Sequence, residues 1–299
     1  MSRIALDVHA HQVPIDRERL GQLPGVAWNA DAGCLVVDGS PLKVSGLYEP
    51  SRLVEWMDEQ QISQTFVSVP PPVYRQYLGE SDACIWADYL NSGLLAIASA
   101  WSGRLSALMH LPLEHAGLAS ELWSRQGGKG FVGAALAAGG SPSIDYSSAA
   151  LDPLWQGLDE ARAFVFIHPG HCCDGRLAPF YLDNLIGNPY ETTIAASKLL
   201  MADVPRRYPG IRFCLAHAGG YLGAACGRLQ HGFATRRPGV PDDMEPPAQA
   251  VRRFYVDSIA HSDALLALAH ETFGEDKVLF GSDWPFPMGD LHPDRREMK

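Results

Sequence analysis

Two histidines separated by one residue stand near the start of the chain. They are His9 and His11, in the run DVHAH at residues 7–11, which follows a short apolar segment. Side chains alternate across a β-strand, so both imidazoles would point to the same side, about 7 Å apart along the strand. Imidazole nitrogens are common zinc ligands. The pair by itself is equally consistent with a metal site and with two unrelated histidines.

Three more polar residues follow apolar runs later in the chain. They are His168 after FVFI, His217 after FCLA and Asp283 after LFGS. A single histidine after an apolar strand is more often a hydrogen-bonded core residue. Three such residues together with the histidine pair favour one common site, because the carboxyl ends of barrel strands meet on a single catalytic face.

These candidate residues follow short apolar runs that are rich in β-forming residues. Eight occur, at residues 4–9, 65–70, 105–111, 130–136, 163–168, 212–217, 254–259 and 278–283. Their apolar character fits strands buried on both faces of a parallel sheet. Helical patterns lie between them at residues 52–61, 81–101, 154–162, 192–207 and 262–273. This alternation predicts an α/β protein of the (β/α)8 TIM-barrel class.

The length of 299 residues fits one such barrel, so we expect residues 1–299 to form a single domain. Two segments interrupt the alternation. Residues 12–48 are predicted to be an insertion after the first strand, with a small hairpin around 34–37, and residues 231–250 are predicted to be an irregular loop. Loops of this length are usually lids, binding elements or interfaces. The chain stops at Lys299, sixteen residues after Asp283, which predicts a short C-terminal end of the barrel.

The composition argues against several other classes of protein. Hydrophobic residues make up 46% and charged residues 19%, as in globular proteins. The formal charge is 24 − 34 = −10, which disfavours nucleic acid or an anionic membrane as the partner. No window offers about 18 uninterrupted apolar residues and no secretory leader is evident, so neither a membrane span nor export is expected. Six scattered cysteines favour a reducing, cytoplasmic location.

The order of the motifs resembles the amidohydrolase superfamily. The order is HxH, then His-Pro, then AHAGG at residues 216–220, then GSDWPF at residues 281–286. Within the superfamily it is similar to the aminocarboxymuconate-semialdehyde decarboxylase group. The resemblance continues in residues 174–176, 187–195, 227–233 and 285–287, so it covers most of the chain.

The resemblance implies that His9, His11, His168 and Asp283 bind one divalent metal ion, with zinc expected and manganese the alternative. It also implies that a water completes the shell, with His217 beside it as general acid or base. Asp283 is the second candidate for proton transfer. Two-metal relatives use a lysine or an acid from the fourth strand. Here that strand ends ALAAGG at residues 135–140, with neither, so one ion is expected.

Four residues are carried over from the resemblance as candidates for substrate binding: Phe286, Arg236, Asn184 and Lys43. Phe286 belongs to the Pro-Phe-Pro run after Asp283. Arg236 matches a family arginine that reaches into the neighbouring subunit's site, which predicts a homodimer. Asn184 stands where the family has an active-site tryptophan. The family's carboxylate-binding arginine is absent, and Lys43 is the residue that could take part of its role, although lysine lacks arginine's bidentate geometry.

Two reaction classes are compatible with these residues. The first is decarboxylation of a small unsaturated or aromatic carboxylic acid, with His217 or Asp283 protonating the carbon that loses the carboxylate. The alternative is a hydrolase or hydratase acting on an amide, lactone or unsaturated acid in the same barrel. A non-catalytic barrel is disfavoured because all five site positions carry competent residues. The expected partners are a small anionic metabolite and a second copy of the chain.

Overall fold

The computed structural model describes residues 3–293. The described chain divides into two compact units. The first comprises residues 3–110, 130–132 and 280–293, and the second comprises residues 111–129 and 133–279. The first unit therefore contains segments from both ends of the sequence.

Among the described residues, eight parallel strands follow one another in the sheet in the order in which they occur in the chain. Those of the first unit are β1 (Ile4–His11), β5 (Ile62–Ser68) and β6 (Leu105–His110). Those of the second unit are β7 (Gly133–Ala138), β8 (Phe164–Pro169), β9 (Arg212–Leu215), β10 (Tyr255–Asp257) and β11 (Val278–Leu279). Each predicted strand overlaps one of these eight, so the predicted alternation is confirmed.

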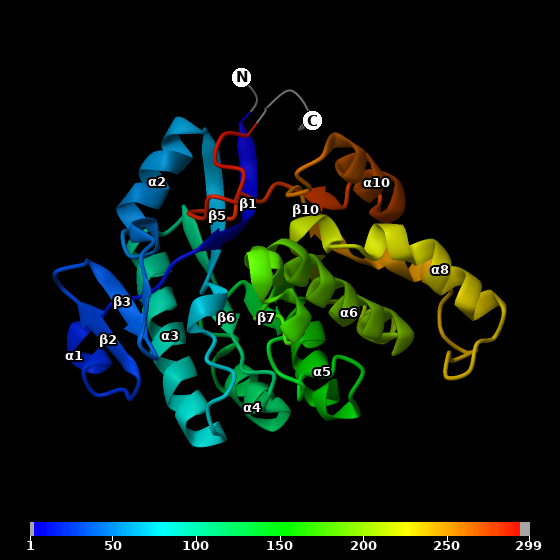
Figure 1. The fold of residues 1–299 in the computed structure, drawn as a ribbon, viewed down its shortest axis with the longest axis horizontal. Helices are drawn as coiled ribbons and strands as arrows, with labels where there is room; N and C mark the ends of the chain where they lie inside the picture. The colour runs from blue at the N-terminus through cyan, green and yellow to red at the C-terminus, as the bar shows by residue number, and fades with distance from the viewer. Residues whose placement is uncertain (1–2, 294–299) are drawn as a thin grey trace. The chain divides into compact units, whose positions relative to one another are not determined.

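In the first unit, β1 pairs in parallel with β5, and β5 pairs with β6. Two helices, α2 (Pro50–Glu59) and α3 (Glu80–Ala100), connect these strands (Figure 1). The end of the chain also pairs with the first strand. The amide of Val8 donates to the carbonyl of Phe280 at 2.9 Å, and the amide of His11 donates to the carbonyl of Trp284 at 2.8 Å. Pairing of the last segment with the first strand is what closure of a barrel requires.

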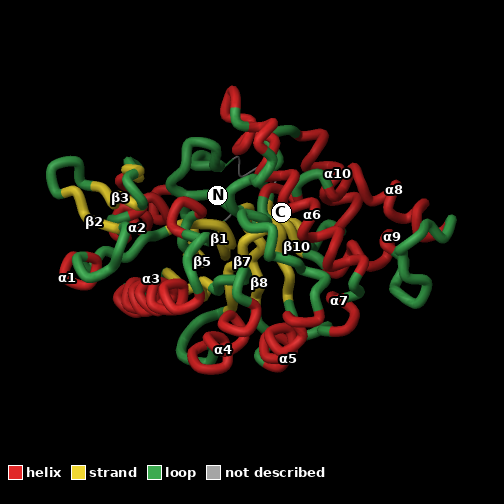
Figure 2. Tube along the Cα trace, turned by 60° about the horizontal axis from the view of Figure 1, so that its bottom comes forward, coloured by secondary structure: helices red, strands yellow, loops and turns green. Residues whose placement is uncertain are grey.

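The insertion after β1 forms its own small antiparallel sheet. Its strands are β2 (Val26–Asn29), β3 (Cys34–Val37) and β4 (Ser40–Leu42), preceded by the short helix α1 (Arg17–Leu20). Figure 2 shows β2 and β3 as adjacent strands close to α1. Arg75, in the loop after β5, donates to both carboxylate oxygens of Asp38 at 3.1 and 2.9 Å and so ties this sheet to the loop. The predicted hairpin around residues 34–37 is confirmed.

In the second unit, each strand pairs in parallel with the next, from β7 to β11. Its helices are α4 (Ala116–Gln126), α5 (Asp152–Glu160), α6 (Asn188–Met201), α7 (Val204–Arg207), α8 (Leu222–Ala234), α9 (Pro247–Ala250) and α10 (Asp263–Phe273). Aromatic side chains fill its interior. The ring of Phe213 contacts two other aromatic rings. Its centroid is 5.7 Å from that of Trp155 and 6.0 Å from that of Phe254.

Two sequence predictions need correction in this unit. The helix predicted at residues 192–207 is broken at Asp203, whose φ of 56° is left-handed, because Pro205 cannot lie in a helix interior. The irregular loop predicted at residues 231–250 spans only residues 235–246, since α8 continues to Ala234 and α9 begins at Pro247. Arg236, with a φ of 52°, follows the end of α8.

None of the described helices is both long enough and apolar enough to cross a lipid bilayer.

Candidate active site

Strand β1 carries the histidine pair. His9 and His11 are fully buried, and their Nε2 atoms are 3.2 Å apart. The pairing of β1 with β5 changes register between Asp7 and Ala10, an irregularity of the kind that re-aims side chains next to active sites. The predicted convergence of the two imidazoles is confirmed.

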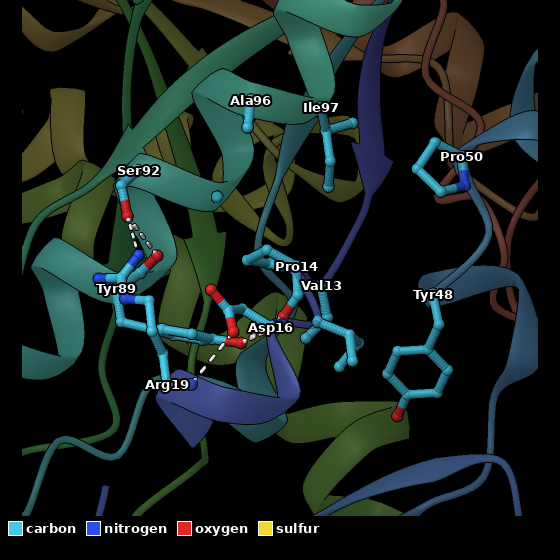
Figure 3. A pocket seen from close by; sticks show the side chains of 12 residues that line it. Val13, Pro14, Asp16, Arg19, Tyr48, Pro50, Tyr89, Ser92, Ala96 and Ile97 are labelled. Carbon is cyan, nitrogen blue, oxygen red and sulfur yellow. Dashed lines mark hydrogen bonds between the residues drawn. The ribbon is translucent and has the colours of Figure 1, made fainter. Parts of the chain in front are cut away.

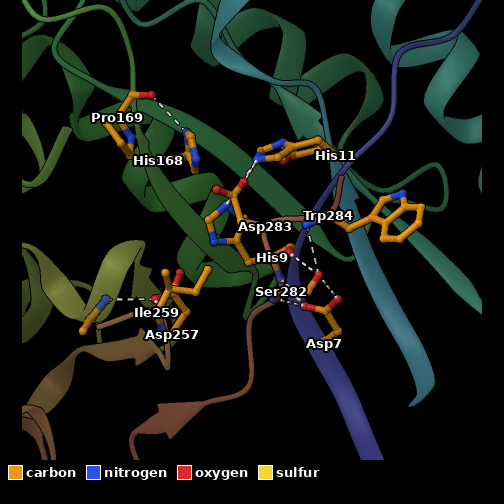
Figure 4. A network of polar contacts seen from close by, with 12 residues as sticks. Asp7, His9, His11, His168, Pro169, Asp257, Ile259, Ser282, Asp283 and Trp284 are labelled. Atoms are coloured by element: carbon orange, nitrogen blue, oxygen red, sulfur yellow. Dashed lines mark hydrogen bonds and ion pairs between the residues drawn. The ribbon is translucent and has the colours of Figure 1, made fainter. Parts of the chain in front are cut away.

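Asp283 lies beyond β11, in the segment that hydrogen-bonds to β1. Its Oδ1 is 3.3 Å from Nε2 of His9 and 3.2 Å from Nε2 of His11 (Figure 4). Its φ of 55° is left-handed, a conformation that is costly for a residue other than glycine. The Asp283 amide donates to the His9 carbonyl at 2.7 Å, which helps to hold this backbone in place.

A buried carboxylate links the two segments that carry these three residues. Oδ1 of Asp7 accepts from the amides of His9 and Ser282, both at 3.0 Å, and Oδ2 accepts from the Ser282 hydroxyl at 2.6 Å. Burial raises the pKa of Asp7 to about 7, against the opposing effect of these hydrogen bonds. Asp7 belongs to the DVHAH motif but was not predicted to have a role. The sequence feature that could have indicated its supporting role is an acidic residue two positions before a candidate ligand.

His168 ends strand β8 of the second unit. Its Nδ1 lies 3.0 Å from the Pro169 carbonyl oxygen (Figure 4). A carbonyl can only accept, so Nδ1 carries the proton and Nε2 keeps its lone pair for a ligand, the arrangement usual for metal-binding histidines.

Four buried residues offer ligand atoms to one ion. One atom each from His9, His11, His168 and Asp283 lies within 4.8 Å of the others. Three of these atoms, Nε2 of His9, Nε2 of His11 and Oδ1 of Asp283, are 3.2–3.3 Å apart. These separations match the edge of a tetrahedron, about 3.3 Å, around an ion bound at about 2.0–2.1 Å. Three imidazoles and one carboxylate suit zinc or another divalent transition metal. The residues therefore fit a single divalent cation, as predicted.

His217 follows strand β9 and lies beside His168. The two rings are 5.4 Å apart between centroids, at 61°. His217 and Ala218 both have positive φ, 56° and 52°. A fully buried carboxylate holds this turn, because Oδ1 of Asp257 accepts from the amides of Ala218 and Ile259 at 2.9 and 3.1 Å (Figure 4). Asp257 was not among the predicted residues.

The first turn of α6 contacts the loops that follow β8 and β9. The Thr193 hydroxyl accepts from the Tyr221 amide at 2.8 Å and donates to the Pro189 carbonyl at 2.7 Å. The thiol of Cys172 hydrogen-bonds the carboxylate of the buried Glu191. Since these loops begin just after His217 and His168, this turn of α6 supports both histidines.

The four residues predicted to bind substrate lie in different surroundings. Phe286 packs edge to face on His11, with ring centroids 5.5 Å apart. Lys43 and Arg236 are exposed, and Asn184 is half-buried in the π-helical segment Asp183–Gly187. Only for Phe286 does a described contact with a candidate ligand support the assignment, and for the other three it stays a prediction.

The chain belongs to the amidohydrolase family, whose model matches residues 6–299. A 2-amino-3-carboxymuconate-6-semialdehyde decarboxylase of Dictyostelium discoideum is 26% identical, over 97% of this chain and 84% of the relative. Two solved structures share the fold, which confirms the predicted TIM-barrel class. A 5-carboxyvanillate decarboxylase from Sphingomonas paucimobilis has a TM-score of 0.81 at 17% identity, over 97% of this chain and 91% of that chain. A dihydroxybenzoic acid decarboxylase from Polaromonas, with bound manganese and 2-nitroresorcinol, has a TM-score of 0.76 at 22% identity, over 95% and 87%.

Proposed function

We propose that this protein is a metal-dependent decarboxylase, a carbon–carbon lyase, of a small aromatic or unsaturated carboxylic acid. The observation that carries the proposal is the buried group of His9, His11, His168 and Asp283 with His217 beside it. The reaction class is supported by the decarboxylases that are similar to this chain over nearly its whole length.

The four ligand residues would hold one divalent ion. Such an ion supplies Lewis-acid chemistry, which polarises a substrate oxygen. The nitrogen-rich ligand set favours zinc. Manganese is the alternative, supported by the manganese bound in the similar Polaromonas enzyme.

The side chains around the ion account for the remaining chemistry. When the bond to the carboxylate breaks, its electron pair stays on the substrate carbon, CO2 leaves, and that carbon takes up a proton. His217 is the first candidate donor, because an imidazole exchanges protons near neutral pH. Asp283 is the second. Phe286, packed against His11, would form an apolar wall beside the substrate.

The test is CO2 release from a panel of aromatic and unsaturated acids by the metal-loaded protein. We expect release from at least one acid, its loss after chelation, and its return with zinc or manganese. His9→Ala is expected to lose both the metal and the activity. The alternative, a hydrolase or hydratase, would replace the proposal if no acid released CO2 while an amide, a lactone or an unsaturated acid was turned over.

We also propose a cytoplasmic homodimer acting on a small anionic metabolite. The exposed Arg236 beyond α8 fits a residue offered to a partner subunit. Light scattering checks the assembly, and a monomer at micromolar concentration would contradict it.

A further inference from the structure

Tyr74 carries a polar group with no visible structural role. It lies in the loop after β5, just beyond the 3-10 turn Pro71–Val73, and is 4% exposed. Its hydroxyl is buried and has no hydrogen-bond partner among the described residues. A buried donor without a partner loses its hydration and gains nothing in return, so such groups call for a functional explanation.

The ring of Tyr74 is held by a second buried aromatic group. It stacks on His110 at 5.3 Å between centroids and 20° between planes. Asn91 fixes the backbone of His110, donating to its carbonyl at 2.9 Å and accepting from its amide at 2.8 Å. Burial lowers the pKa of His110 to about 4, so this support is uncharged near neutral pH. Tyr74 is therefore a rigidly held, neutral donor.

The loop that carries Tyr74 starts at the metal ligands. Ser68, the last residue of β5, is opposite His11 in the sheet, and its hydroxyl is 3.2 Å from Nδ1 of His11. Burial and the negative charge of Asp283 both raise the pKa of the Tyr74 phenol, so the phenol stays protonated near neutral pH.

The cations of this region are not available for the same task. Lys43 is exposed. Arg75, next to Tyr74 in the chain, binds both oxygens of Asp38 and the Pro24 carbonyl, and its side chain is 5% exposed. A Cβ on Gly25 would lie 2.4 Å from Nη2 of Arg75, so the space around the guanidinium is filled. The guanidinium of Arg75 therefore anchors the insertion after β1.

The pocket of the first unit shown in Figure 3 is a weaker candidate for a binding group. It has a volume of about 370 Å³ and lies among residues 13–19, Tyr48 and α3. Its hydroxyls already have partners: Tyr48 donates to the Leu42 carbonyl at 2.6 Å, and Tyr89 donates to the Pro14 carbonyl at 2.9 Å. Tyr74 differs from both tyrosines because its donor is unused.

We propose that the Tyr74 hydroxyl, supported by His110, is the donor that binds the substrate carboxylate at the metal centre. The inference rests on the proposed function and names the group that recognises the substrate, a neutral phenol in place of the arginine that the family has and this chain lacks. A neutral donor suits a carboxylate that must leave as uncharged CO2. A cation would stabilise the charged ground state, which does not lower the barrier.

The experiment compares two Tyr→Phe variants in the metal-loaded protein. Tyr146 is the matched control, because its buried hydroxyl donates to the Ala137 carbonyl at 2.9 Å. Calorimetry measures binding of 2,6-dihydroxybenzoate and of resorcinol, which has the same ring and hydroxyls without the carboxylate. We expect Tyr74→Phe to weaken binding of the acid about 10-fold, the effect of one hydrogen bond to a charged group, and to leave resorcinol unchanged.

Stability gives an independent readout. Tyr74→Phe is expected to keep or raise the urea midpoint, since it removes an unpaired buried group, whereas Tyr146→Phe is expected to lower the midpoint without changing binding. Equal losses for both probes, unchanged binding of the acid, or failure of the wild type to bind the acid would each overturn the inference. Absence of CO2 release with a preserved Tyr74 effect would instead refute the proposed function alone.

Discussion

The candidate ligands of the first unit and His217 of the second unit are each supported by a buried carboxylate on a strand, Asp7 within β1 and Asp257 at the end of β10. Asp7 accepts hydrogen bonds from the backbone amides of His9 and of Ser282, the residue before Asp283. Asp257 accepts a hydrogen bond from the backbone amide of Ala218, the residue after His217. In both places the supported turn contains a residue with positive φ. The same device therefore stabilises two strained backbones, which a barrel uses to aim side chains at its catalytic face.

The two regions differ in burial and in cross-linking. His9 and His11 are 0% exposed, and Asp7 also accepts a hydrogen bond from the Ser282 hydroxyl, so this region is closed to solvent and cross-linked. His217 is only half-buried. A ligand group gains from being fixed and desolvated, whereas a proton carrier must reach its substrate. We therefore assign metal binding to the closed region together with His168, and proton transfer to His217.

The largest expected effect tests this division directly. His217→Asn should lower kcat about 100- to 10,000-fold, the usual contribution of a general acid or base, and leave the metal content unchanged. His168→Asn, which removes the neighbouring imidazole, should lose the metal. Elemental analysis and steady-state kinetics make the comparison, and metal loss from His217→Asn would mean that the two regions are not separate in function.

Asp7→Asn probes the carboxylate of the closed region. The amide oxygen of asparagine can still accept from the two backbone amides that Oδ1 binds, but the amide nitrogen in place of Oδ2 cannot accept from the Ser282 hydroxyl. Because this bond between the two segments is lost, we expect about 10- to 100-fold weaker metal binding. Asp38→Asn is the control, because Asp38 pairs with Arg75 away from the ligands. Titration against a competing chelator measures both. Equal affinities for Asp7→Asn and wild type would remove Asp7 from the ligand-positioning role.

His110 gives a pH prediction within the first unit. Its pKa falls from about 6.5 in an unfolded chain to about 4, so the unfolded state binds the proton first as pH decreases. Its stabilisation is complete above about pH 6.5 and is lost progressively down to about pH 4. Between pH 7 and 5 the loss is about 2 kcal/mol. Urea unfolding of His110→Phe should show a correspondingly smaller decrease, and an identical decrease would show that His110 titrates normally.

The smallest effect concerns the turn of α6 behind His217. Thr193→Val removes the acceptor for the Tyr221 amide, and we expect kcat to fall about 5-fold, equivalent to about 1 kcal/mol, with metal affinity unchanged. Thr192→Val is the control, because Thr192 bonds only the Asn188 carbonyl within its own helix. A kcat–pH profile that is the same for both variants would assign Thr193 a purely structural role.

The strands and the candidate metal ligands could be predicted from the sequence alone. Each strand is a local apolar run, and the period-2 alternation that puts His9 and His11 on one side is a property of the strand alone. Because the carboxyl ends of barrel strands share one face, His168, His217 and Asp283 could be assigned to a common site without coordinates. Phe286, in contrast, was carried over from the family resemblance of the run that contains it.

The groups that hold these residues in place could be identified only in the folded structure. Asp7 and Ser282 are 275 residues apart, and Asp257 lies 39 residues beyond the amide that it binds. The stacking of Tyr74 on His110 likewise joins the loop after β5 to the end of β6. Local patterns predict which face a side chain occupies, but a hydrogen bond between distant segments depends on the packing of the whole unit. For that reason the sequence could name the candidate ligands but not their supports.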